Sequence, residues 1–136
     1  MNTIQTQNDI IEDFKVLEGD LEMTLNYLME LGEDLEVLEE KHKTDENIVK
    51  GCQSKVWLTC TKKDDKIIYK GDSNTSITKG LLSILIQIFN NKTSDEIIKT
   101  DLFFINEIGL NRFIGTQRSN GLESMEKKIK LLAITK

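Results

Sequence analysis

The chain contains no proline, only two cysteines and one histidine, and no long hydrophobic run. Its longest apolar stretch, Leu81–Phe89, is interrupted by Ser83 and Gln87. It is much shorter than the roughly 20 residues that a helix needs to cross a bilayer. The N-terminus has neither the basic start nor the apolar core of a signal peptide. These absences predict a cytoplasmic protein without a membrane segment.

Residues that usually carry catalysis or hold metals are also scarce. Cys52, Cys60 and His42 supply too few soft ligands for a four-ligand zinc site, and a reducing cytosol disfavours a disulfide. A phosphate-binding glycine loop, a His-Glu-x-x-His helix and a Gly-x-Ser-x-Gly elbow are missing as well. We therefore expect no metal, no bound cofactor and no independent catalytic activity.

The composition is that of one folded domain covering residues 1–136, with 38% hydrophobic and 30% charged residues. The net charge of −5 is uneven. Residues 1–50 carry 14 acidic and 4 basic side chains, whereas residues 51–136 carry 9 acidic and 14 basic ones. This asymmetry can bring the two halves together or steer a charged protein partner, and the acidic balance argues against nucleic acid as the main ligand.

Hydrophobic periodicity predicts helices and one β-hairpin. Apolar residues recur at helical spacing in Ile10–Leu17, Leu21–Leu31, Thr78–Asn90 and from about Asn120 to the C-terminus, and short helices are expected after Thr93 and over Leu102–Ile108. Val56, Leu58 and Cys60 alternate with more polar residues, and Ile67–Tyr69 follow a polar turn over Lys62–Lys66. Between the helical and hairpin regions, the acidic segment from Gly32 to Lys50 is expected to cross the surface as a long connection.

Three details of packing follow from this pattern. Thr93 and Glu96 match a capping box, in which each side chain bonds to the other residue's backbone N–H. Gly80 is expected to allow close packing of the Thr78–Asn90 helix against the sheet. Cys60 shares a strand face with Val56 and Leu58, which favours a packing role over a second redox role.

Cys52 is the candidate reactive residue because of its position where the long connection enters the first strand. Gly51 permits backbone angles that other residues resist, so the thiol can lie on a turn. Lys50 and Lys55 flank the thiol, and nearby cations favour the nucleophilic thiolate. From composition alone, the alternative that Cys52 is a small buried side chain without reactivity is favoured.

A resemblance to a known family changes that balance. The cysteine motif Val49-Lys50-Gly51-Cys52-Gln53-Ser54-Lys55-Val56-Trp57-Leu58 carries it, together with five further segments. These are, in order, Gly71-Asp72-Ser73, Thr78-Lys79-Gly80-Leu81-Leu82, Asn91-Lys92-Thr93-Ser94-Asp95-Glu96-Ile97, Ile108-Gly109-Leu110 and Arg118-Ser119-Asn120-Gly121-Leu122-Glu123-Ser124-Met125. Together they resemble the SufE family, whose members accept sulfur from cysteine desulfurases during iron–sulfur cluster assembly. The resemblance runs from about Phe14 to the C-terminus.

This resemblance implies an α+β fold in which a small antiparallel sheet of two or three strands packs against helices, as in SufE and related iron–sulfur scaffold architectures. It also implies that the protein accepts persulfide sulfur on Cys52 from a SufS-like cysteine desulfurase and stimulates that enzyme. The protein then passes the sulfur to a SufBCD-like cluster scaffold complex.

Further residues are implied as support for the partner contact or for the cysteine loop. These are Gly51, Gln53, Trp57, Asp72 and Arg118. Trp57 is a candidate for sheltering the persulfide. Arg118, expected just before the last helix, is implied to dock the partner or anchor the loop. Asp72 either accepts hydrogen bonds from backbone donors near the cysteine turn or is an ordinary turn residue.

The chain departs from the family pattern at two places where proline is usual. Ser94 occupies one of them, and Thr116 or Gln117 occupies the other. Because proline stiffens a loop, we expect the loop before Arg118 to be more mobile while the fold and the thiol are retained.

Three alternatives remain open. The first is a scaffold that itself holds iron, for which the likely ligands are too few. The second is a non-catalytic binding module in which Cys52 is inert. The third is a sulfur carrier for a paralogous desulfurase that feeds another pathway.

Overall fold

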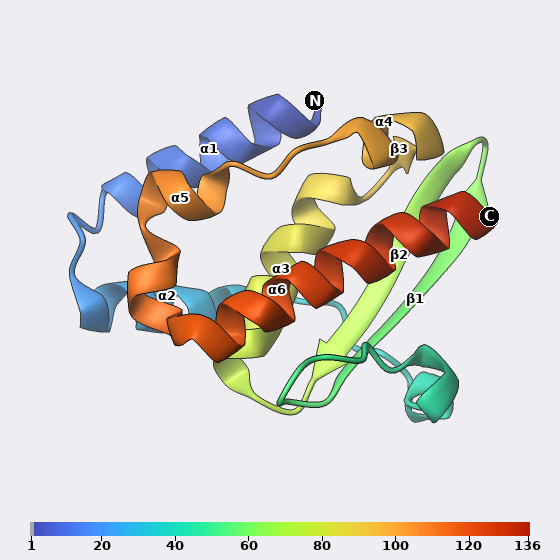
Figure 1. The fold of residues 1–136 in the computed structure, drawn as a ribbon, viewed down its shortest axis with the longest axis horizontal. Helices are drawn as coiled ribbons and strands as arrows, with labels where there is room; N and C mark the ends of the chain where they lie inside the picture. The colour runs from blue at the N-terminus through green and yellow to red at the C-terminus, as the bar shows by residue number, and fades with distance from the viewer. Residues whose placement is uncertain (1) are drawn as a thin grey trace.

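The structure, a computed structural model, describes the backbone of residues 2–136 and the side chains of residues 2–110 and 121–136. Its elements confirm the expected α+β class with a three-stranded antiparallel sheet. Figure 1 labels the α-helices and strands, which are α1 (Thr3–Lys15), α2 (Leu21–Glu33), β1 (Val56–Lys63), β2 (Lys66–Ser73), α3 (Ser76–Phe89), β3 (Lys92–Thr93), α4 (Ser94–Lys99), α5 (Phe104–Ile108) and α6 (Leu110–Thr135). Two 3₁₀ helices, η1 (Glu40–His42) and η2 (Asp45–Asn47), lie between α2 and β1.

The predicted hairpin is longer than the sequence pattern indicated. β1 and β2 pair from Val56↔Ser73 to Lys63↔Lys66, and the turn contains only Asp64 and Asp65. Both aspartates have positive φ angles, 51° and 67°, which a two-residue hairpin turn requires and which aspartate tolerates better than most residues. The short strand β3 then pairs with the start of β2, giving the strand order β1-β2-β3.

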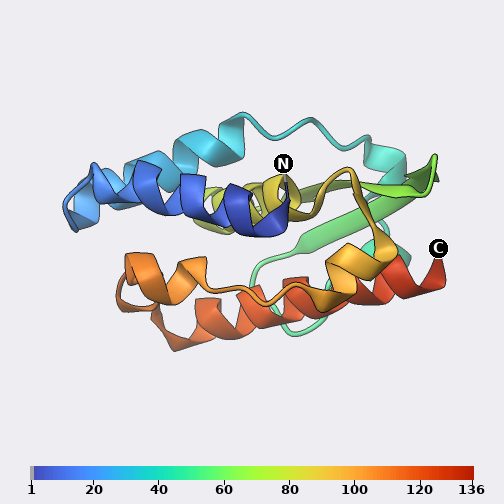
Figure 2. The same cartoon turned by 90° about the horizontal axis from the view of Figure 1, so that it is seen from above.

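The central helix is α3, as predicted. It is in contact with α1, α2, α6 and β2, and its buried residues include Leu81, Ile84, Leu85 and Ile88. Figure 2 shows α5 and α6 along one side of the molecule and α1 and α2 toward the other. The inner face of the sheet, with Val56, Leu58, Cys60, Ile67 and Tyr69 buried, packs on α3 and α6. The Tyr69 hydroxyl donates to the carbonyl oxygen of Ile129 in α6 at 2.7 Å.

Gly80 allows a close helix crossing, but the partner is α2 rather than the sheet. A Cβ on Gly80 would meet the backbone of Leu28, and a Cβ on Gly32 would lie 2.9 Å from the backbone nitrogen of Gly80. The two glycines therefore let the backbones of α2 and α3 approach one another. The expectation that Gly80 faces the sheet was wrong because periodicity shows which residues share a helix face, not which element covers that face.

The capping box after Thr93 is only half formed. The Thr93 hydroxyl accepts from the backbone N–H of Glu96 at 3.3 Å, so α4 begins as predicted. The Glu96 carboxylate instead accepts from the backbone N–H of Thr3 at 3.2 Å. There it satisfies a free donor in the first turn of α1 and lies where the helix dipole favours a negative charge.

The last helix is the largest departure from prediction, because α6 begins at Leu110 rather than near Asn120. The segment expected to be a loop before Arg118 is therefore helical in its backbone. Gly115 and Gly121 weaken the helical pattern of this sequence. Tertiary packing overrides that weak preference, since Leu110, Leu122, Met125 and Ile129 are all buried along α6.

The acidic connection between α2 and β1 crosses the surface, as expected, and the structure places it beside the hairpin. It contains η1 and η2, and Leu38 within it is buried. Glu36 forms an ion pair with Lys70 of β2 at 3.5 Å. No helix among the described residues is long and apolar enough to cross a membrane.

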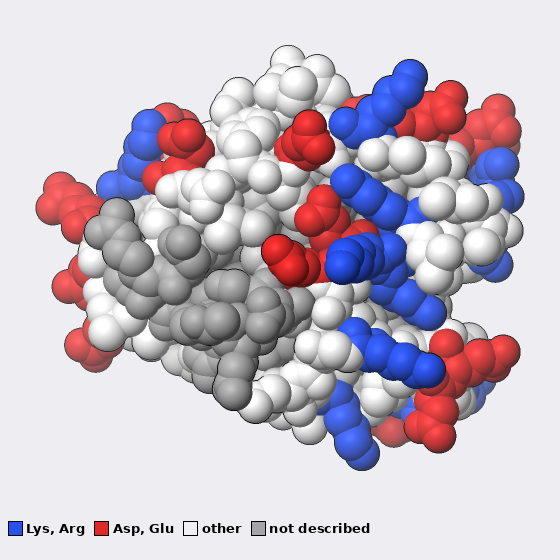
Figure 3. Space-filling view, in the orientation of Figure 1, with Lys and Arg blue, Asp and Glu red and all other residues white. Residues whose placement is uncertain are grey.

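Charges of the two signs adjoin one another over much of the surface. On the face shown in Figure 3, basic side chains gather over the C-terminal half of α6, and acidic side chains lie beside them. Further acidic side chains lie at the left edge, at the upper right and over the 3₁₀ helices at lower right.

Candidate functional site

Cys52 lies in a short turn whose two ends are joined. The backbone N–H of Val49 donates to the carbonyl of Val56 at 2.8 Å, and Ile48 forms a bridge with Trp57. Between these ends, Gly51 has a φ of +93°, an angle that residues with a side chain rarely adopt. The predicted use of Gly51 is confirmed, since it turns the chain so that Cys52 follows at the tip.

The turn packs directly against α6. The Cys52 Sγ lies 3.5 Å from the carbonyl oxygen of Gly121, with the thiol as donor. A Cβ on Gly51 would lie 2.5 Å from the Ser124 Oγ, so with a larger residue at Gly51 either the Ser124 side chain or the turn would have to shift. The thiol is half-buried as a result.

A small cavity of about 110 Å³ adjoins Cys52. On the same measure a cavity needs roughly 10–15 Å³ to hold one water molecule, so this one has room for an additional sulfur atom. Its lining combines residues of the turn, of the start of α3 and of α6: Cys52, Gln53, Ser54, Thr75, Thr78, Leu81, Gly121 and Met125.

Hydrogen bonds anchor the C-terminal side of the turn to the segment that leads into α3. The backbone N–H of Lys55 donates to the Asn74 side chain at 2.9 Å, and the backbone N–H of Asn74 donates back to the Lys55 carbonyl at 3.1 Å. The Ser54 hydroxyl lies 2.9 Å from that of Thr75 and 3.3 Å from that of Thr78. The cavity is therefore held together on one side by three hydroxyl groups.

Burial raises the pKa of the Cys52 thiol. Lys50 and Lys55 were expected to favour the thiolate, but both side chains are exposed and neither lowers this pKa. That expectation was wrong because neighbours in sequence at a turn need not direct their charges at one another. At rest the thiol is protonated and donates to the Gly121 carbonyl.

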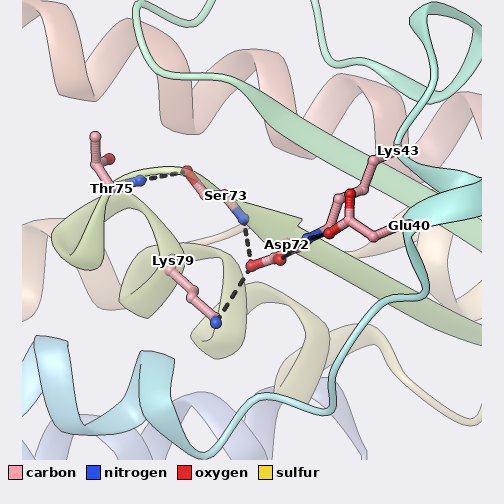
Figure 4. A network of polar contacts seen from close by, with 6 residues as sticks. All are labelled: Glu40, Lys43, Asp72, Ser73, Thr75 and Lys79. Atoms are coloured by element: carbon pink, nitrogen blue, oxygen red, sulfur yellow. Dashed lines mark hydrogen bonds and ion pairs between the residues drawn. The ribbon is translucent and has the colours of Figure 1, made fainter.

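Asp72 is the centre of a charged network, shown in Figure 4. Its carboxylate lies 2.9 Å from the Lys43 Nζ and 3.3 Å from the Lys79 Nζ, and it accepts from the Ser73 backbone N–H at 2.8 Å. Partial burial alone would raise the pKa of Asp72, but these three donors together lower it. The network ties the connection after η1 to the end of β2 and to α3.

Trp57 belongs to this network rather than to the cavity. It pairs with Asp72 across the hairpin, and the Lys43 Nζ lies 5.7 Å from the centre of its ring. A cation at that distance is attracted to an aromatic face. Trp57 is not among the residues that line the cavity beside Cys52, whereas Gln53 is. The expected role of Trp57 as a shelter for sulfur stays a prediction.

Two further expectations concern residues away from the cavity. Cys60 is buried on the inner face of β1, as predicted, and does not line the cavity. Arg118 lies in the part of α6 whose side chains are outside the described residues. Within the described part of the chain, no three His, Cys, Asp or Glu side chains gather as a metal site would require.

The sequence did not identify most of the cavity. Thr75, Thr78, Leu81 and Gly121 come from segments distant from Cys52 in the chain. Several of them lie in the segments that carry the family resemblance, but no local pattern places them opposite a cysteine. Only the folding of α3 and α6 around the turn brings them together.

Comparison with known proteins points to one family. A sequence model of the SufE family, described as an Fe-S metabolism associated domain, matches residues 8–133. An uncharacterized SufE-like protein of Rhizobium meliloti is 38% identical over 128 residues, covering 90% of this chain and 91% of that protein. A second uncharacterized SufE-like protein, from Rhizobium etli, is 41% identical over 128 residues, covering 90% and 86%.

A solved structure supports the fold independently. The solution structure of a hypothetical protein from Thermus thermophilus matches with a TM-score of 0.77 and covers 96% of this chain and 97% of its own. Its sequence is only 17% identical, so the likeness concerns the fold alone.

Proposed function

The chain belongs to the SufE family of iron–sulfur metabolism domains, and we propose that it accepts persulfide sulfur from a cysteine desulfurase on Cys52. In this proposal it stimulates a SufS-like desulfurase and hands the sulfur to a SufBCD-like cluster scaffold. The observation that carries the proposal is the position of Cys52, at the tip of a glycine turn and beside a cavity of about 110 Å³.

The transfer is an exchange between two sulfur centres. The Cys52 thiolate attacks the terminal sulfur of the desulfurase persulfide. A new S–S bond forms to Cys52, and the bond between the terminal sulfur and the desulfurase cysteine breaks. The electron pair leaves with the desulfurase sulfur, which takes up a proton equivalent to the one that Cys52 lost. Nothing is oxidised or reduced overall, so the step needs no external oxidant.

The surroundings of Cys52 in the resting protein suit a sulfur carrier better than a nucleophile that is active without its partner. Because burial raises the pKa of Cys52, the thiol is a weak nucleophile until the desulfurase changes its surroundings. This restrains side reactions while no partner is bound. After transfer, the cavity covers the added sulfur in part and so limits its contact with water and oxidants.

Mass spectrometry tests the assignment. The protein is incubated with a SufS-like desulfurase and cysteine, and peptides are searched for one added sulfur atom. We expect the sulfur on Cys52, no acceptance by Cys52→Ala, and nearly unchanged acceptance by Cys60→Ala. Both variants are compared with the wild type by circular dichroism to show that they fold.

Other outcomes distinguish the remaining alternatives. Sulfur found on Cys60 would overturn the site. Full stimulation of the desulfurase by Cys52→Ser would favour a binding module with an inert thiol. Stimulation of a paralogous desulfurase alone would redirect the delivered sulfur to another pathway.

A further inference from the structure

The cavity beside Cys52 is more polar than shelter from water requires. The hydroxyl-bearing residues Ser54, Thr75 and Thr78 line it together with the apolar residues Leu81 and Met125. Hydroxyl groups are costly to bury unless they form hydrogen bonds, so an apolar lining would exclude water at less cost. We infer that these hydroxyls hold the sulfur received on Cys52 as a persulfide anion, with Thr78 donating to the terminal sulfur. This inference rests on the proposed function.

Counting hydrogens shows that a donor is available. The three hydroxyls carry three hydrogens, and the two contacts that Ser54 makes with Thr75 and Thr78 use two of them. No acceptor among the described residues takes the third. In every arrangement of the two contacts, this third hydrogen belongs to a side chain that lines the cavity.

In the resting protein, burial favours the arrangement in which Thr78, only 7% exposed, donates to Ser54, Ser54 donates to Thr75, and the exposed Thr75 keeps its hydrogen for water. A persulfide anion in the cavity reverses this chain. Thr75 then donates to Ser54, Ser54 donates to Thr78, and the Thr78 hydrogen turns to the terminal sulfur. Thr75 and Thr78 also lie at the N-terminal end of α3, where the helix dipole favours a negative charge.

The chemistry of the two sulfur species explains why such a donor is useful. The resting thiol is a hydrogen-bond donor and is satisfied by the carbonyl of Gly121. A persulfide is a stronger acid than the corresponding thiol and is therefore ionised at a lower pH. An ionised persulfide cannot donate to Gly121, and a buried anion is stable only where donors face it. The hydroxyls supply those donors on the other side of the cavity lining.

The experiment loads Cys52 without the desulfurase, so that it does not depend on the partner. Protein carrying Cys60→Ala is treated with inorganic polysulfide, whose terminal sulfur is transferred to the thiolate while the shortened polysulfide leaves. The persulfide is then alkylated with iodoacetamide between acidic and neutral pH. Mass spectrometry of the Cys52 peptide gives the rate, and the pH midpoint reports ionisation of the persulfide.

Three threonine substitutions distinguish the effect of the Thr78 hydroxyl from the effect of the shape of its side chain. Thr78→Val keeps the shape of the side chain and removes the hydroxyl. We expect the pH midpoint of persulfide alkylation to rise by about one unit, because the loss of one hydrogen bond to a charged group corresponds to a shift of about that size. Thr78→Ser keeps the hydroxyl and should match the wild type. Thr61→Val makes the same chemical change on an exposed position of β1 and should have no effect.

A further variant tests the hydroxyl chain. Ser54→Ala removes the middle hydroxyl and should shift the midpoint upward by less than Thr78→Val does. Equal alkylation midpoints for Thr78→Val and for the parent Cys60→Ala protein would overturn the inference, and so would a Thr78→Ser variant that behaves like Thr78→Val. Failure of the parent protein to keep the polysulfide sulfur on Cys52 would overturn it too. If the shift occurs but no desulfurase transfers sulfur, the proposed function fails while the anion site stands.

Discussion

The Cys52 thiol lies beside the carbonyl of Gly121, and its reactivity is set by what surrounds it in space. Burial raises its pKa, and the flanking lysines do not offset that effect. A group whose neutral form is favoured in the fold ionises only at higher pH. The resting protein therefore keeps its one candidate nucleophile protonated.

This protonation is measurable by alkylation. We expect iodoacetamide to modify Cys52 in the Cys60→Ala protein with a pH midpoint above that of the same chain unfolded in urea. The direction follows from burial, which is lost on unfolding. Coinciding midpoints would show that burial does not raise the pKa of Cys52, and a lower native midpoint would show that the fold stabilises the thiolate at rest.

At the scale of elements, the approach of α2 to α3 determines how the start of α3 is placed. Gly32 and Gly80 lie where the two helices meet, and α3 begins at the residues that line the cavity. A side chain at this crossing would separate the backbones, because the nearest neighbours of a Gly80 Cβ belong to the main chain of Leu28. Main-chain atoms cannot rotate away as a flexible side chain can.

Gly80→Ala is therefore expected to destabilise the protein by about 3 kcal/mol, the cost of overpacking a tight site. The measurement is the midpoint of urea unfolding followed by circular dichroism. Gly121→Ala is the matched control within a helix. Its Cβ would lie 3.5 Å from the Cys52 Sγ, an ordinary contact, so stability should be unchanged or higher by up to about 1 kcal/mol. Equal losses for both variants would contradict the role of the crossing.

At the scale of the whole molecule, α6 joins the site to the sheet. The same helix contacts the cysteine turn through Gly121 and receives the Tyr69 hydroxyl of β2 at Ile129. The Ser94 hydroxyl donates to the carbonyl of Ala133 at 2.8 Å, and the Lys130 Nζ donates to the carbonyl of Thr100 at 2.7 Å. These bonds hold α6 against segments from three parts of the chain.

Tyr69→Phe tests the link between the sheet and α6. Phenylalanine keeps the buried ring and removes only the hydroxyl, so we expect a loss of about 1 kcal/mol in the free energy of unfolding. Burial strongly raises the pKa of Tyr69, so the hydroxyl keeps its proton and the effect should be the same across neutral pH. An unchanged urea midpoint would show that the bond contributes nothing to stability.

Much of this protein was determined by its sequence alone. Local periodicity predicted α1, α2, α3 and the hairpin, because the spacing of apolar residues reflects which side of an element is buried. The capping residues Thr93 and Glu96 predicted the start of α4. Gly51 and Cys52 were identified for the same kind of reason, since a turn residue and the residue that follows it are neighbours in the chain. The resemblance to the SufE family rested on segments that can be compared without any structure.

Tertiary structure decided what depends on distant segments meeting. The length of α6 was missed because Gly115 and Gly121 weaken a helix whose stability comes from packing. Glu96 left its own helix to cap α1, and Gly80 met α2 instead of the sheet. The pKa of Cys52 and the hydroxyls beside it likewise follow from the way α3 and α6 enclose the turn. Burial and hydrogen-bond partners are properties of neighbours in space, and the order of residues along a chain does not state them.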